Sequence, residues 1–360
     1  MVKGPFDGLI GHDRVIGLLA REVPAPAHAY LFAGPSNVGK TTVAHRFAAA
    51  LLCEHRGEHD VLCSSCRRAD SGNHPDLIAV EPDGRTALSV EQARATVAQA
   101  PMAPVEGDRK VFVFDEAGSM SEQAASALLK TLEEPTPSTV FVLVVESEDD
   151  LPATIASRCR TVQFGRVREE ALIAALQEHG TDPEKAGEAA RISGGRPGLA
   201  LGLVSNPDLA AYRDLWLSVP VRVSPHPGEA FRLADEVLEA AEPLLKTLDV
   251  RQTSEESDDL PPSRLKALQE RHDRDRRREK RALHITGLEI LASWYADAAS
   301  AQFGGPVRNH DIPAATLAMI RPDAAVANAE RVLNAVTELQ ANQRPQLVFT
   351  TLFAELTPAT

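Results

Sequence analysis

The sequence lacks any long uncharged apolar run, although hydrophobic residues make up 43% of its 360 residues. A membrane-spanning helix needs roughly 18 such residues in succession, so we expect no membrane span and no membrane partner. The first residues, Met1 to Val15, also lack the apolar core and small-residue cleavage site of a signal peptide. These absences predict a cytoplasmic protein.

Net positive charge is lacking as well, because the formal net charge is -13 at pH 7. A protein that coats DNA through bulk electrostatics needs a positive surface, so the composition argues against that class. Any contact with nucleic acid is then local, or shared with other subunits of an assembly. A protein that never touches DNA fits equally well.

Cysteine is scarce, with four in the chain, three of them close together at Cys53, Cys63 and Cys66. Clustered thiols in a reducing compartment fit a metal site better than a disulfide framework. The fourth, Cys159, stands alone.

The length of the chain limits the number of domains, because 360 residues leave room for two or three.

The first part of the chain, residues 1–165, alternates strand-like and helix-like segments. Short, continuous, β-branched apolar runs are typical of parallel strands that helices cover on both faces. The pattern predicts an α/β domain with a parallel sheet. Its expected strands are 29–34, 110–117 and 139–145, and its expected helices are 41–52, 89–99 and 121–132.

The remainder of the chain reads as helical. Short helices rich in Ala, Leu and Glu predict a small helical lid domain at 166–205, followed by a C-terminal helical domain at 206–360. The tract 253–281 resembles an insertion, because acidic residues precede Pro261-Pro262 and nine basic residues against four acidic ones follow at 264–281. It is interpreted either as a solvated helix or disordered arm, or as a contact for DNA or a partner.

The strongest motif is an uninterrupted G-x-x-x-x-G-K-[ST] match between a predicted strand and a predicted helix. Its glycines let backbone N–H groups turn inward around phosphates, and the following helix adds its positive end. Lys40 would neutralise the β and γ oxygens of ATP, and the Thr41 hydroxyl would bind Mg²⁺. The predicted nucleotide-binding residues are Gly34, Pro35, Ser36, Asn37, Val38, Gly39, Lys40, Thr41 and Thr42.

A second motif completes the expected site. The apolar strand that begins at Lys110 ends in Asp115-Glu116. Asp115 would hold Mg²⁺ through its bound waters, and Glu116 could polarise the attacking water as a general base. Acidic residues at strand ends are common, but downstream of a complete phosphate loop they favour a nucleotide role.

Longer stretches carry a resemblance to a family. Gly11 to Val15, His28 to Phe32, Ala127 to Pro135, Ser138 to Phe141 and Leu151 to Cys159 are ordered matches over about residues 6–201. Together they resemble the AAA+ clamp-loader subunits of bacterial DNA polymerase III, of the delta-prime or the gamma/tau type. The resemblance implies a lid domain, a collar-like C-terminal domain, partners among the gamma/tau and delta subunits, a sliding clamp, and primed DNA.

The resemblance also implies roles for single residues. Arg158, in Ser157-Arg158-Cys159, would be an arginine finger that reaches the nucleotide of an adjacent subunit. Arg196, in a Gly-Gly-Arg-Pro-Gly stretch, would be a second sensor that reaches back from the lid to the phosphates, although the stretch equally suits a turn between helices.

The family's zinc module interrupts the ATPase domain with four cysteines. Cys53, Cys63 and Cys66 match its first three positions, but Ala69 stands at the fourth. A closed structural Zn²⁺ site needs four ligands. Either His55, His59, Asp70 or His74 supplies the missing one, or the site holds three reduced thiols and no metal.

Departures from the family separate the two subunit types. An active family ATPase would carry a hydroxyl or amide sensor at position 145 or 146, where this chain has Val145 and Glu146. This difference, the lid stretch and the end at residue 360 favour a delta-prime type that binds ATP and acts mainly through its neighbour. A gamma-type ATPase that hydrolyses ATP itself is the alternative, and another AAA+ repair or remodelling ATPase is the third.

Overall fold

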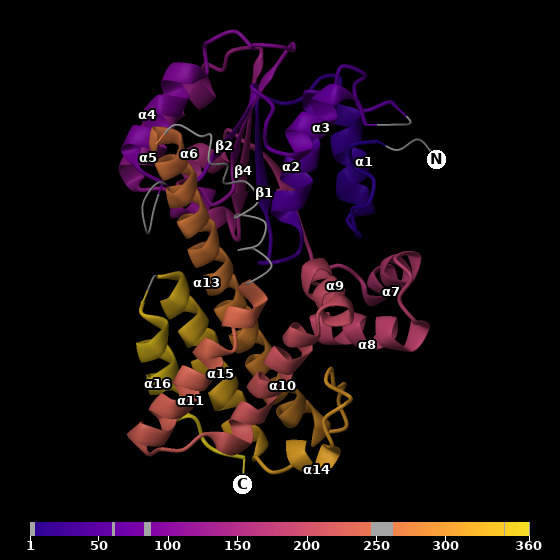
Figure 1. The fold of residues 1–360 in the computed structure, drawn as a ribbon, viewed down its shortest axis with the longest axis vertical. Helices are drawn as coiled ribbons and strands as arrows, with labels where there is room; N and C mark the ends of the chain where they lie inside the picture. Colours follow the sequence, from indigo (N-terminus) through magenta and orange to yellow (C-terminus); the bar gives the residue numbers. More distant parts are fainter. Residues whose placement is uncertain (1–3, 60–61, 83–87, 246–261, 342, 360) are drawn as a thin grey trace. The chain divides into compact units, whose positions relative to one another are not determined.

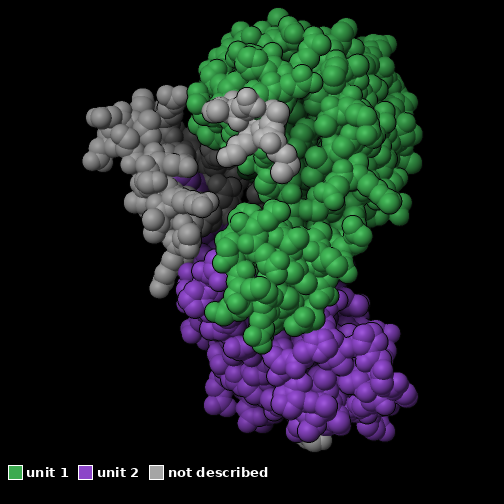
Figure 2. All heavy atoms as spheres, turned by 90° about the vertical axis from the view of Figure 1, so that its right-hand side faces the viewer, with its two compact units in different colours: residues 1–201 green, residues 202–360 purple. Residues whose placement is uncertain are grey.

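The computed structural model describes residues 4–59, 62–82, 88–245, 262–341 and 343–359 (Figure 1). These residues divide into two compact units, 1–201 and 202–360, which Figure 2 colours separately. The predicted division into domains 1–165, 166–205 and 206–360 stays a prediction. No helix among the described residues has the length and apolar content that a bilayer crossing requires.

The first unit is built on a five-stranded sheet with the order β2-β3-β4-β1-β5, in which every neighbouring pair is parallel. The mixed α/β class with a parallel sheet, predicted from the apolar runs, is therefore confirmed. The strands are β1 Ala29–Ala33, β2 Leu77–Val80, β3 Lys110–Phe114, β4 Thr139–Val145 and β5 Arg160–Gln163.

Alternate side chains of the strands enter two separate cores, because successive residues of a strand point to opposite faces. Tyr30 and Phe32 of β1 pack with Phe47 on one face, whereas Leu31 packs with Leu128 on the other. Both faces are therefore buried, which explains why the strands read as continuous apolar runs. Figure 1 shows the helices that supply the two coverings on opposite sides of the sheet.

The helices of the first face are α1 Asp13–Glu22, α2 Lys40–Leu51 and α3 Ser64–Asp70. Those of the second face are α4 Val90–Gln99, α5 Glu122–Glu133 and α6 Ala153–Ala156, with short 3₁₀ segments η1 Ala117–Ser119 and η2 Glu148–Asp150 between strands and helices. Ser89 and Ser121 cap α4 and α5, because their hydroxyls accept hydrogen bonds from the N–H groups of Gln92 and Ala124.

Three further helices follow the sheet: α7 Glu169–Glu178, α8 Pro183–Ser193 and α9 Pro197–Ser205. Gly194 and Gly195 between α8 and α9 have φ angles of 57° and 85°. A Cβ on Gly195 would lie 2.9 Å from the Val167 carbonyl oxygen, so glycine is required for this turn.

The second unit is entirely helical among its described residues. Its helices are α10 Pro207–Arg222, α11 Pro227–Glu239, α13 Pro262–Ala301, α14 Ala314–Leu317, α15 Pro322–Gln340 and α16 Pro345–Glu355. Trp216 of α10 is fully buried, with ring contacts to Phe349 and Phe353 of α16. A buried aromatic side chain removes about 150–250 Å² from water, so this packing contributes strongly to the core of the unit.

The charged tract 253–281 is described only from Pro262 onward, and Thr253 to Pro261 lie outside the described residues. Pro262 to Arg281 form the first part of α13, which continues without a break to Ala301. Glu242 accepts hydrogen bonds from Arg276, at 2.8 Å, and from Lys280. Part of the basic charge is therefore paired within this unit, and the predicted contact with DNA or a partner stays a prediction.

Gly287 of α13 yields a test of the packing in the second unit. A Cβ at this position would lie 2.1 Å from Cε2 of the Trp216 indole. Helix propensity alone predicts that Gly287→Ala stabilises the unit by about 1 kcal/mol, whereas overpacking predicts a loss of about 1–3 kcal/mol. We expect the loss, measured by urea unfolding followed through tryptophan fluorescence. A more stable variant would contradict this packing.

Candidate functional site

The pairing of the strands brings three chain segments to one edge of the sheet. Ala33 at the end of β1 lies opposite Val145 at the end of β4, and Phe114 at the end of β3 lies opposite Leu143. The residues that follow are Gly34, Glu146 and Asp115. Ligands of open parallel sheets bind outside the carboxyl ends of the strands, so this edge is the candidate site.

The predicted phosphate loop connects β1 to α2 at this edge. Gly34 has a φ of 154°, and a Cβ there would lie 2.2 Å from the Phe164 carbonyl oxygen, so no other residue fits. Asn37 and Gly39 also have positive φ angles, of 61° and 100°. Such a chain path directs successive backbone N–H groups to one side, as a phosphate cradle requires.

Helix α2 begins at Lys40, directly after the loop, so its positive end faces the cradle. The ring of His12 is hydrogen-bonded through Nε2 to the Val38 carbonyl oxygen at 2.8 Å and packs edge-on against Phe164. His12 therefore holds the loop from the outside. Only the loop itself was expected from the sequence, because this contact spans 26 positions along the chain.

Lys40 is nearly buried, with 7% of its surface exposed. Its Nζ donates to the carbonyl oxygens of Gly34 and Pro35, both at 2.7 Å. Burial lowers the pKa of Lys40, while the negative charges of Glu146 and Asp150 act in the opposite direction. The ammonium group thus lies inside its own loop, where the oxygens of a bound phosphate could replace the two carbonyl partners.

Asp115 lies beside α2 in a nearly buried position. One carboxylate oxygen, Oδ2, is 3.1 Å from Nε2 of His45, and the other, Oδ1, is buried without a hydrogen-bond partner. A buried carboxylate oxygen left in this way suits a hard cation or one of its waters, so Asp115 fits the Mg²⁺ role expected of it. His45 was not expected from the sequence.

Glu116 follows Asp115 and is partly exposed at the start of η1. Its backbone carbonyl oxygen accepts a hydrogen bond from the Ser119 hydroxyl at 2.7 Å. The structure therefore places Glu116 at the same edge as Asp115, and its role as a general base stays a prediction.

Of the two alternatives for a sensor position, Val145 is buried in the core with 4% of its surface exposed. Glu146 is the residue that meets the phosphate loop, because its Oε1 accepts a hydrogen bond from the Ser36 hydroxyl at 2.5 Å. Its backbone carbonyl oxygen accepts from the Gly34 N–H at 3.1 Å. A carboxylate therefore stands where the family would place a hydroxyl or an amide.

Both predicted arginines have hydrogen-bond partners outside the phosphate loop. Arg158 donates to the Thr154 carbonyl oxygen at 2.6 Å and to Glu133 Oε1 at 2.5 Å, with 34% of its side chain exposed. Arg196 is 1% exposed and donates through Nε to the Ser193 carbonyl oxygen at 2.8 Å. That Arg158 reaches the nucleotide of an adjacent subunit, and that Arg196 reaches the phosphates in its own chain, both stay predictions.

The cysteine cluster lies at the other end of α2. Cys53 follows this helix, Cys63 caps α3 by accepting the Cys66 N–H, and Cys66 lies in the first turn of α3. One ligand atom from each of these cysteines and from His59 lies within 4.8 Å of the other three. His59, one of four alternatives from the sequence, therefore takes the place that Ala69 leaves.

The distances between the ligand atoms of this cluster suit a metal ion with tetrahedral coordination. The sulfurs of Cys53 and Cys63 are 3.9 Å apart, and His59 Nε2 is 3.4 Å from the Cys66 sulfur. In a tetrahedral zinc site, bonds of about 2.3 Å to sulfur and about 2.0 Å to nitrogen place neighbouring ligand atoms about 3.5–3.8 Å apart. Three cysteines and one histidine are an established donor set for structural zinc.

The other candidates for the fourth ligand have different partners. Asp70 forms an ion pair with Arg46 at 2.8 Å. His74 is buried and hydrogen-bonded to the Ser65 hydroxyl and the Asp76 N–H. His55 packs its ring edge-on against His59. None of the three belongs to the four-residue cluster found among the described residues.

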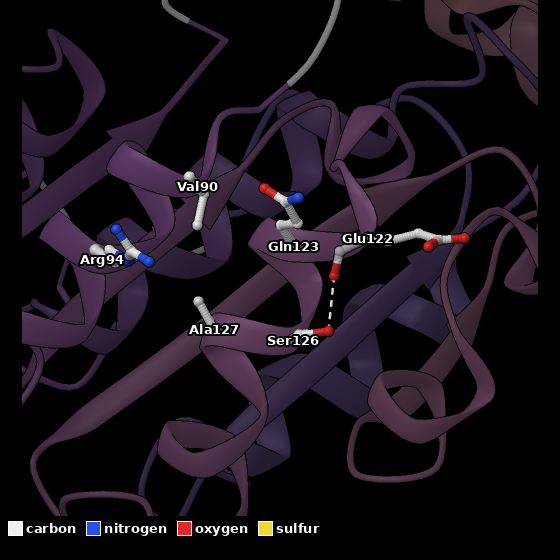
Figure 3. A pocket seen from close by; sticks show the side chains of 6 residues that line it. All are labelled: Val90, Arg94, Glu122, Gln123, Ser126 and Ala127. Carbon is white, nitrogen blue, oxygen red and sulfur yellow. Dashed lines mark hydrogen bonds between the residues drawn. The ribbon is translucent and has the colours of Figure 1, made fainter.

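A surface groove of about 480 Å³ lies between α4 and α5 (Figure 3). Arg94 and Gln123 line it, and the Ser126 hydroxyl within it donates to the Glu122 carbonyl oxygen at 2.8 Å. No residue of the phosphate loop lines this groove, so it is separate from the candidate nucleotide site.

Comparisons with known proteins agree with the resemblance seen in the sequence. Residues 13–168 match the family model described as DNA polymerase III, delta subunit. The chain is 36% identical over 178 residues to DNA polymerase III subunit delta' of Bacillus subtilis, covering 48% of this chain and 53% of that protein. It is 32% identical over 177 residues to the tau subunit of the same organism, covering 48% of this chain and 31% of that protein.

The chain therefore spans about half the length of the delta' relative and a third of the tau relative. A DNA polymerase III gamma-subunit-related protein of Thermotoga maritima aligns over 95% of this chain and 98% of its own, with 16% identity and a TM-score of 0.44. That structural likeness bears on neither activity nor partners. By these sequence matches, the first half of the chain is similar to DNA polymerase III subunits of the delta-prime and tau/gamma type.

Proposed function

We propose that this chain is a delta-prime-type clamp-loader subunit that binds ATP with Mg²⁺, supplies Arg158 to a neighbouring ATPase and helps load a sliding clamp on primed DNA. The observation that carries the nucleotide part is the meeting of the loop, Lys40 and Asp115 Oδ1 at one sheet edge. The family match supports the assembly part.

Each group at the site has a distinct task in this proposal. The loop amides and the start of α2 bind the phosphates, and Lys40 exchanges its two carbonyl partners for phosphate oxygens. Thr41 and Asp115 would hold Mg²⁺, which supplies neutralising charge when bound. Thr42 lies in the first turn of α2, where its N–H points toward the same cradle.

The second candidate is a gamma-type subunit that hydrolyses its own ATP. The intact loop and Glu116 favour it, because a general base follows the Mg²⁺ ligand. Glu146 counts against it, since a carboxylate next to the loop cannot donate a hydrogen bond to a γ-phosphate as an amide or hydroxyl does. The family match counts against an unrelated AAA+ remodeller.

For Arg158 we propose that, when the complex assembles, a phosphate group of the adjacent subunit's nucleotide replaces Glu133 as its partner. The pair is partly exposed, and such ion pairs contribute only about 0–1 kcal/mol. An arginine held this weakly can leave Glu133 for the more concentrated charge of a phosphate group. DNA contact would be shared with other subunits, in keeping with the net charge of -13.

For the cysteine cluster we propose a structural Zn²⁺ held by Cys53, His59, Cys63 and Cys66. Burial raises the pKa of the Cys63 thiol, but hydrogen bonds from the Cys66 N–H, the neighbouring thiols and the Ser65 N–H outweigh it and hold that pKa below its usual value. The ion would fix the connection between α2 and α3.

Lys40→Ala tests the nucleotide site. Charge-assisted hydrogen bonds contribute about 1.5–3 kcal/mol, so binding of MgATP, measured by calorimetry, should weaken by about tenfold or more. Lys130→Ala is the matched control, because Lys130 is exposed on α5. ATP turnover by the isolated chain that Lys40→Ala abolishes would favour the gamma-type alternative instead.

Arg158→Ala tests the action in trans. In a complex reconstituted with gamma/tau and delta subunits, turnover at the adjacent site should fall by about 10³-fold, because arginine fingers have effects of this size. MgATP binding by the isolated chain should stay unchanged. Arg168→Ala, an exposed arginine at the start of α7, is the control. Unaltered turnover of the Arg158→Ala complex would remove this role.

Metal analysis tests the cysteine cluster. Protein purified without chelator should contain about one zinc ion per chain, and His59→Ala should lower both zinc content and resistance to heat. His55→Ala is the control, since His55 lies next to His59 but outside the cluster. Fewer than about one zinc ion in ten chains would show that the thiols are simply reduced.

A further inference from the structure

Glu146 is held in place by two hydrogen bonds to the phosphate loop and by a third to the turn that follows β4. Its backbone carbonyl oxygen accepts the Gly34 N–H at 3.1 Å, and its Oε1 accepts the Ser36 hydroxyl at 2.5 Å. Its own N–H donates to Asp150 Oδ2 at 3.0 Å. Ser36 and Glu146 are 110 positions apart, so this contact depends on the β1–β4 pairing. The carboxylate is therefore aimed at the loop and restrained from turning away.

The turn after β4 adds a second fixed negative charge. Asp150 Oδ2 also accepts the Ser147 N–H at 2.7 Å, which closes the η2 turn back onto Glu146. The charges that act on Lys40 are those of Glu146 first and then Asp150. Both negative charges therefore act on the lysine that reaches the outer phosphates in this motif.

ADP and ATP interact differently with the negative charges of Glu146 and Asp150. The loop amides and the start of α2 bind the inner phosphates, which ADP and ATP have in common. Only ATP brings a γ-phosphate to the outer side of Lys40, where Glu146 competes for the same ammonium group and repels the added charge. An amide in place of the carboxylate would carry no charge and could donate to a γ-phosphate oxygen.

We propose that Glu146 is a selectivity residue that makes this site bind nucleoside diphosphate more tightly than triphosphate in the isolated chain. This inference rests on the proposed nucleotide site and specifies its ligand. A subunit of this kind would keep ADP between cycles, and its neighbours would determine when a triphosphate enters.

The test is calorimetric titration of the full chain with MgADP and with MgATPγS, for the wild type and for Glu146→Gln. Wild type should bind MgADP more tightly. Removing one charge near contact distance should tighten MgATPγS by about fivefold or more at low salt, with little change for MgADP. Because Glu146 is exposed, the preference of the wild type should shrink as salt rises.

Two further variants separate charge from contact. Asp149→Asn removes one charge from the same turn at an exposed side chain, and we expect it to leave the preference for MgADP in place. Ser36→Ala removes the hydrogen bond to Glu146 but keeps its charge, so a preference for MgADP should persist.

The outcomes are distinct. If Glu146→Gln tightens the binding of MgADP and MgATPγS equally, Glu146 only stabilises the conformation of the empty loop. If the variant binds MgATPγS more weakly, Glu146 assists binding of the triphosphate. Either result overturns the proposal. If neither protein binds either nucleotide, the proposed function itself is wrong, and the selectivity is wrong with it.

Discussion

The pairing of β1 with β4 and β5 is the constraint on which the candidate site depends. It places the phosphate loop directly beside Glu146, and it brings Phe164, which follows β5, so close to Gly34 that a Cβ there would lie 2.2 Å from the Phe164 carbonyl oxygen. The loop can take its phosphate-binding path only between these two neighbours. A shift of the register would separate the loop from Glu146 and from the strand end that carries Asp115.

The helix that follows the loop links the two candidate sites. Lys40 is the first residue of α2, and Cys53 follows its last turn. A metal ion bound by Cys53, His59, Cys63 and Cys66 would anchor one end of this helix while the phosphates of a nucleotide engage the other end. Stable positioning of α2 matters for binding, because His45 on the same helix also fixes Asp115.

Much of the fold could be predicted, since β1, β3 and β4 are buried on both faces and read as unbroken apolar runs. Two strands were not predicted. β2 has only four residues, and β5 alternates exposed Arg160 and Gln163 with the buried Val162, so neither has a run long enough to stand out. Short strands depend on their partners more than on their own composition.

The candidate site, like the fold, could be predicted only in part from the sequence. The loop, Asp115 and the three cysteines could be predicted because local motifs carry them, whereas His45, His12 and the choice of His59 depend on how distant segments meet. Spacing alone left four candidates for the fourth metal ligand. Glu146 was noticed as a departure from the family, but its contact with Ser36 required the sheet register.

The proposed site requires that the segment 34–42 binds the phosphates of a nucleotide in the chain by itself. Hydrogen exchange with and without MgADP measures this most directly, because bound phosphates protect the amides that contact them. We expect slower exchange at the amides of residues 34–42 and at the start of α2. Unchanged exchange there, at MgADP concentrations that saturate binding, would place the nucleotide elsewhere and contradict the proposed site.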